Sequence, residues 1–78
     1  IEMKDLVEII AKSLVDHPEQ IAVTETDEDG IIKIDLTVAP EDMGKVIGKQ
    51  GRIAKAIRSV VKAAASKEEK KVIVEIMQ

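Results

Sequence analysis

The segment that most constrains this chain is residues 46–58, where Gly48 and Gly51 separate two apolar stretches. Glycine is favoured where the backbone takes a positive φ or where another molecule approaches the main chain closely. The spacing therefore predicts a helix, a tight exposed loop and a second helix, with both glycines at positive φ. The rest of the chain has to support this pair of helices.

Cations surround the loop and carboxylates do not. Between residues 43 and 66 there is no Asp or Glu, and the cations are Lys45, Lys49, Arg52, Lys55, Arg58 and Lys62. This segment carries +6 in a chain of net charge −3, so the remaining residues carry −9. Solvated helices usually mix the two signs of charge. One basic segment on an acidic body is typical of a site for a polyanion.

The residues before the loop predict one helix and two strands. Residues 3–16 place apolar side chains on one helical face, namely Met3, Leu6, Val7, Ile10, Ala11 and Leu14. His17 before Pro18 ends this helix, because proline disfavours the helical conformation in the preceding residue. Residues 21–26 and 31–39 alternate in polarity and predict two strands, joined by an acidic turn in which Gly30 takes a positive φ.

The two helices around the loop are predicted from their ends and their apolar spacing. Pro40, followed by Glu41 and Asp42, marks the start of a helix over residues 40–47. Its core candidates are Met43, Val46 and Ile47. Gly44 inside this helix costs about 1 kcal/mol relative to alanine, which indicates close packing against a neighbour or a ligand.

The second helix runs from Gly51 to about residue 66, and a strand over residues 71–77 completes the chain. The expected core stripe of the helix is Ile53, Ile57, Val60 and Ala64, with Val61 at its edge. In the strand Val72, Val74 and Ile76 share one face. The order α-β-β-α-α-β predicts an α+β fold, a three-stranded sheet with helices packed on one face. We expect one domain over residues 1–78, with Ile1 and Glu2 left over from expression.

Composition excludes several classes of protein. The chain has no Cys, so disulfides and thiolate metal sites are excluded and a reducing cytoplasm is favoured. It has no aromatic residue, which argues against RNA readers that stack bases on aromatic platforms. No apolar run reaches the roughly 18 residues of a membrane span. With one His and scattered carboxylates we expect no enzyme activity, no metal and no cofactor.

The pattern Val-Ile-Gly-x-x-Gly-x-Ile at residues 46–53 resembles the core of the KH domain, an RNA-binding module. The whole order α-β-β-α-α-β resembles the type II KH domain of bacteria. Residues 38–52 are more specifically similar to the small stand-alone bacterial KH proteins of the KhpA group. The resemblance implies binding of single-stranded RNA, as a post-transcriptional regulator or RNA chaperone, commonly beside a larger Jag-type protein that carries its own KH domain. A homodimer would raise the effective affinity of a single site.

In the expected mechanism the backbone N–H groups of residues 48–51 and the Lys49 ammonium hold phosphates, while bases turn toward an aliphatic groove formed by the two helices and an adjacent strand. Val46 and Ile53 are candidates for the groove wall and equally for the core. The predicted RNA-binding residues are Lys45, Val46, Gly48, Lys49, Gln50, Gly51, Arg52, Ile53, Lys55, Ala56 and Arg58.

Two other functions remain open at this point. The apolar helix edge with Val60 and Val61 would serve a protein-interaction module that pairs two chains. Two helices joined by a glycine turn, the second one basic, would also suit a helix-turn-helix DNA binder. Two glycines where one would serve, and the three strands, weigh against the second alternative. The glycine spacing matches neither the dinucleotide-binding fingerprint nor the P-loop.

Overall fold

The computed structural model describes residues 2–78, with the backbone alone for Lys49, so the expectation for Ile1 lies outside the described residues. The helices and strands follow the predicted order. They are α1 (Met3–Leu14), β1 (Ala22–Glu28), β2 (Ile31–Thr37), α2 (Pro40–Ile47), α3 (Arg52–Lys67) and β3 (Lys71–Met77). Two short 3-10 turns, η1 (Pro18–Gln20) and η2 (Lys49–Gly51), precede β1 and α3. Within residues 2–78 no helix is long and apolar enough to cross a membrane.

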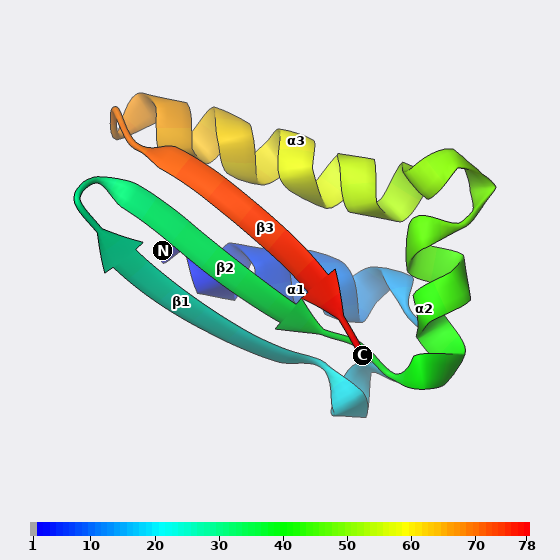
Figure 1. The fold of residues 1–78 in the computed structure, drawn as a ribbon. Helices are drawn as coiled ribbons and strands as arrows, with labels where there is room; N and C mark the ends of the chain where they lie inside the picture. Colours follow the sequence, from blue (N-terminus) through cyan, green and yellow to red (C-terminus); the bar gives the residue numbers. More distant parts are fainter. Residues whose placement is uncertain (1) are drawn as a thin grey trace.

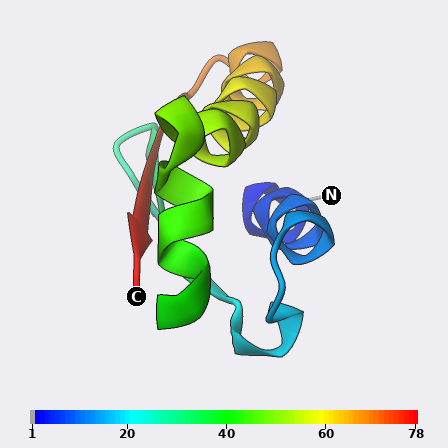
Figure 2. The same ribbon diagram turned by 90° about the vertical axis from the view of Figure 1, so that its right-hand side faces the viewer.

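The strands form one mixed sheet with β2 in the centre. The order is β1-β2-β3, in which β1 pairs antiparallel and β3 pairs parallel with β2. Helices α1 and α3 lie side by side on one face of this sheet (Figures 1 and 2). Helix α2 stands at the end where β2 and β3 finish, and the turn from α2 to α3 projects away from the sheet (Figure 1). The predicted α+β class and element order are confirmed.

The alternation of the strands sets which face is buried. Ile32, Ile34 and Leu36 of β2 are at most 3% exposed and form the centre of the core. Val74 of β3 is buried on the same side, as predicted. The opposite face of the sheet is open, and Ile31 and Ile73 there are 42% and 50% exposed. The period-two pattern therefore identified the core face of the sheet correctly.

The turn between β1 and β2 is tighter than predicted. Strand β1 continues to Glu28, and only Asp29 and Gly30 lie in the turn, with φ of 53° and 79°. Positive φ at both central residues is the conformation of a type I′ hairpin, which matches the right-handed twist of the strands and favours Asp-Gly. The positive φ predicted for Gly30 is confirmed. The acidic residues before it belong to the strand because they extend its pairing with β2.

Helices α1 and α3 differ from prediction in which side chains they bury. In α3 the buried residues are Ala54, Ile57, Val61 and Ala65. Ile53 and Ala64 are only half-buried and Val60 is 43% exposed, so the predicted stripe was displaced by about one residue around the helix. The two small alanines at its ends bring α3 close to the sheet and α1. In α1, Leu14 at the last turn is 37% exposed, and the helix ends there rather than at residue 16.

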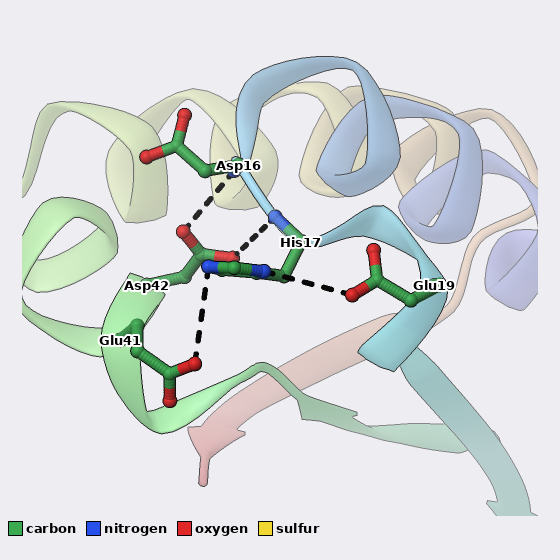
Figure 3. Close-up of polar contacts among 5 residues, drawn as sticks. All are labelled: Asp16, His17, Glu19, Glu41 and Asp42. Carbon is green, nitrogen blue, oxygen red and sulfur yellow. Dashed lines mark hydrogen bonds and ion pairs between the residues drawn. The ribbon is translucent and has the colours of Figure 1, made fainter.

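A buried carboxylate joins the end of α1 to the start of α2 (Figure 3). Asp42 is 0% exposed and accepts hydrogen bonds from the backbone N–H groups of Asp16 at 3.1 Å and His17 at 2.9 Å. The His17 ring lies between the carboxylates of Glu19 at 3.6 Å and Glu41 at 3.8 Å. The chain after α1 has left its helix, so its N–H groups need an acceptor, and Asp42 supplies both. This contact fixes where α2 begins.

Candidate nucleic-acid interface

The loop between α2 and α3 is a single tight turn. Helix α2 ends at Ile47, Gly48 is extended with φ −76° and ψ −176°, and α3 starts at Arg52. Gln50 and Gly51 both take the left-handed conformation, with φ of 64° and 67°. The positive φ predicted for Gly51 is confirmed. Two successive left-handed residues reverse the chain, so α3 begins immediately after the loop.

Gly48 is required for a different reason than predicted. Its φ is negative, so the expectation of a positive φ there is wrong. A Cβ at this position would collide with the carbonyl oxygen of Gly44, which already accepts a hydrogen bond from the Gly48 N–H at 2.7 Å. Apart from its chain neighbours and the adjacent backbone of α2, no described atom lies within 4 Å of the place where a Cβ of Gly44 would be. Its side of α2 is open to an approaching molecule.

The hydrogen bonds of the loop decide which N–H groups remain for a ligand. The Gly48 N–H donates a hydrogen bond to the carbonyl oxygen of Gly44 at 2.7 Å, and the Gly51 N–H donates to the carbonyl oxygen of Gly48 at 2.8 Å. The first N–H groups of α3, from Arg52 onward, have no acceptor inside the helix by geometry, and no side chain caps this end. Donors for an anion thus come from Gln50 and the first turn of α3, where the helix dipole also favours negative charge.

The cations predicted for the site are placed unequally. Arg52, Lys55 and Arg58 are exposed on α3 and project from successive turns. The Lys45 ammonium lies 3.1 Å from the Asp16 carboxylate, which partly neutralises it. The side chain of Lys49 lies outside the described residues. A basic edge therefore runs from the loop along α3.

This edge leads to a groove of about 880 Å³ between α3 and the outer edge of β3. Arg58, Lys62, Ala65 and Ser66 form the helix wall. The strand supplies Lys71, Val72, Ile73 and Val74, and Ile31 of β2 lies behind them. The Arg58 guanidinium donates a long hydrogen bond, 3.4 Å, to the carbonyl oxygen of Val74 and so spans the groove. Glu69 also lines the groove, which therefore combines an apolar floor with a rim of four cations and one carboxylate.

The structure brings only part of the predicted set to this groove. Arg58 lines it, whereas Val46 is 1% exposed in the core, so the packing role is the one the structure shows. Ile53 is half-buried against the core, and Ala56 is exposed on α3 outside the groove lining. The groove uses one helix and the strand edge, not both helices as expected. Ile47, expected in the core, is 52% exposed beside the loop.

Three cations of the groove were not among the predicted site residues: Lys62, Lys70 and Lys71. Lys62 follows Arg58 by one helical turn, and that spacing is the signal that would have included it. Lys70 and Lys71 line the groove only because β3 is an edge strand next to α3, which the element order does not reveal. The Lys70 ammonium lies 2.8 Å from the Asp27 carboxylate, and this hydrogen bond raises the pKa of Lys70 above its usual value.

Within residues 2–78 no three His, Asp or Glu side chains are placed to hold a metal ion together. What the site offers is the uncapped start of α3 and, further along the same helix, an apolar groove with four cations and one carboxylate at its rim. Such a surface suits a flexible polyanion whose bases carry apolar faces.

The mixed three-stranded sheet, the order α-β-β-α-α-β and the tight Gly-Xaa-Xaa-Gly turn between α2 and α3 are those of a type II KH domain. A family model described as "KhpA/KhpB, KH domain" matches residues 4–76. The chain belongs to this family.

Relatives of the same length support this membership. The chain is 71% identical over 75 residues to the RNA-binding protein KhpA of Clostridium perfringens. The aligned region covers 96% of this chain and 100% of the relative. It is 51% identical over 76 residues to the protein of the same name from Listeria monocytogenes, with coverage of 97% and 100%.

A solved structure shares the fold at low sequence identity. It is Era in complex with MgGDPNP and nucleotides 1506–1542 of 16S ribosomal RNA, with a TM-score of 0.69 and 22% identity. The match covers 96% of this chain and 29% of that one. At this identity the likeness concerns the fold alone.

Proposed function

We propose that this protein binds single-stranded RNA and acts in the bacterial cytoplasm as a post-transcriptional regulator or RNA chaperone, not as an enzyme. The observation that carries the proposal is the continuous path from the loop to the groove. Phosphates bind the N–H groups of Gln50 and the first turn of α3, with Arg52, Lys55 and the loop residue Lys49 around them. The relatives described as RNA-binding proteins KhpA support the same conclusion.

In this mechanism the strand of RNA follows α3 from its N-terminus. Each residue of a helix rises 1.5 Å, so Arg58 lies about 10 Å from the loop and the far end of the groove about 22 Å from it. The bases face the apolar floor at Val72, and the phosphates face Arg58 and Lys62. Without aromatic side chains the bases are held by aliphatic contact and hydrogen bonds, so we expect modest affinity.

The salt dependence of binding tests this function. The parent protein should bind a short unstructured RNA with a log–log salt slope of about −0.7 per phosphate and roughly two to four phosphates. Replacing Arg58 and Lys62 with Gln should weaken binding and flatten the slope by about 0.7 for each cation removed. Titration of a fluorescent RNA at several salt concentrations measures both quantities.

The matched control replaces Lys12 and Lys33 with Gln, which removes the same charge from surfaces outside the loop and groove. It should bind with the slope of the parent protein. A flat salt response of the parent would contradict the proposal and favour the protein-interaction alternative. Tighter binding to duplex DNA than to single strands would contradict it and favour the helix-turn-helix alternative.

We also propose pairing with a second KH-containing chain, either another copy or a larger Jag-type protein. Val61 is fully buried, so the expected interface of two valines reduces to Val60, which is 43% exposed on α3. Linking two weak sites raises the effective affinity for RNA. Sedimentation should show a dimer at high concentration that Val60→Asp abolishes. A strict monomer, alone and with RNA, would remove self-pairing from the proposal.

A further inference from the structure

The end of the groove furthest from the loop lies against the hairpin of β1 and β2. Ile31 pairs with Lys71, and the Lys71 N–H donates to the carbonyl oxygen of Gly30 at 3.3 Å. The hairpin and the turn between α3 and β3 are accordingly neighbours at the same end of the sheet (Figure 1). The last two residues of β1 and these two turns together carry five carboxylates: Asp27, Glu28, Asp29, Glu68 and Glu69.

The Lys70 ammonium at this end of the groove is already paired with a carboxylate. Lys70 lines the groove, yet its ammonium lies 2.8 Å from the carboxylate of Asp27. Asp27 belongs to β1, the strand at the opposite edge of the sheet from β3. The Lys70 charge is therefore drawn past the end of β2 and away from the groove. Among the residues of α3 that line the groove, Lys62 is the last cation, and Lys71 of β3 is the other groove cation at this end.

We propose that Asp27, by holding Lys70, ends the RNA-binding surface at the turn between α3 and β3. The protein then binds a short single-stranded segment and does not bind the part of a longer RNA that continues past this turn. This inference rests on the proposed function and adds the length of RNA that the site selects. A phosphate arriving at this end has to displace Asp27 from Lys70 while it approaches the hairpin carboxylates. Both effects oppose binding, whereas a phosphate nearer the loop meets the exposed α3 cations Arg52, Lys55 and Arg58.

The salt slope measures this boundary because it counts phosphates and is insensitive to the number of registers a longer RNA offers. RNAs of about 6 and about 12 nucleotides are compared, since a KH loop clamps about four. For the parent protein the two slopes should agree. For Asp27→Asn the longer RNA should give a slope steeper by about 0.7, the contribution of one additional phosphate bound by the released Lys70.

Three further variants identify the cause. Lys70→Gln alone should leave the slope unchanged, because in the parent protein Asp27 holds this cation. Combining Asp27→Asn with Lys70→Gln should restore the parent slope. Glu8→Gln is the matched control, since it also removes one carboxylate from an exposed lysine pair, Glu8 with Lys12 at 2.7 Å, but on α1. It should not change the slope.

An Asp27→Asn slope equal to that of the parent overturns the inference while leaving the proposed function intact. A flatter slope for Lys70→Gln alone also overturns it, because Lys70 would then already bind RNA. Failure of the parent protein to bind either RNA overturns the inference and the proposed function together. Thermal melting of each variant confirms that the comparison is made between folded proteins.

Discussion

Replacing Lys49 and Gln50 together with Asp should lower the affinity for single-stranded RNA by about tenfold or more and leave the melting temperature nearly unchanged. The change shifts the local charge by −3 where a phosphate has to approach within a few Å. The fold should tolerate it, because Gln50 takes a φ of 64° and Asp is among the residues that accept this conformation. Surface changes of this kind alter stability by no more than about 0.5 kcal/mol. RNA titration and thermal melting measure the two effects.

A matched control separates the loop from net charge. Replacing Lys12 and Ser13 with Asp also shifts the charge by −3, on the exposed side of α1. Its RNA affinity should fall far less than that of the loop variant. If the loop variant folds and binds RNA as tightly as the parent, the loop is only a turn. If both variants lose affinity equally, overall charge and not the loop governs binding.

Asp42→Ala should destabilise the protein by roughly 2–4 kcal/mol. The substitution leaves the part-buried backbone N–H groups of Asp16 and His17 without their acceptor, and a donor left unpaired away from water costs about 1–3 kcal/mol. In a domain of this size the loss lowers the melting temperature by at least about 10 °C. Urea unfolding should show a lower midpoint with an unchanged slope. Asp42→Asn, which keeps one acceptor oxygen, should fall between Asp42→Ala and the parent.

The neighbouring carboxylate provides the control for this prediction. The Glu41 side chain is 62% exposed in the same first turn of α2 and lies near His17 only through a 3.8 Å ion pair. Glu41→Ala should change the free energy of unfolding by about 0.5 kcal/mol or less. Equal effects of the two substitutions would mean that the loss of charge at the start of α2, and not the buried hydrogen bonds, controls stability.

The strands and the helix order could be predicted because their signals are local. Alternation identified the core faces of β2 and β3, and Asp29-Gly30 supplied the hairpin. In α3 the same reasoning chose Val60 over Val61, since both are apolar and adjacent. The decision depends on Ala54 and Ala65, which are small enough to lie against the neighbouring elements. Alanine is only weakly apolar, so Ala54 and Ala65 contributed little to the predicted apolar face of α3. The face was therefore placed on Val60, whereas the structure buries Val61.

The site was less predictable because its parts meet only in the folded chain. The glycine loop and the cations of α3 are contiguous in sequence, so the sequence analysis could propose them together as one site. The groove requires β3 to be an edge strand beside α3, and the Asp27–Lys70 pair joins β1 to the turn before β3. The sequence analysis recognised Asp42 as a carboxylate in a first helical turn. The backbone N–H groups that donate to it lie 26 and 25 residues earlier in the chain, at Asp16 and His17. Periodicity carries no information about such contacts.

Helix α2 connects the Asp42 contact directly to the loop, so a small tilt of this helix at Asp42 displaces the loop at its other end. Its eight residues span about 12 Å, with Asp42 fastened near one end and Gly48 following the other. A tilt of about 10° at the fastened end moves the loop by about 2 Å, which is enough to misplace a donor relative to a phosphate. The orientation of the loop therefore depends on a buried contact at the far end of α2.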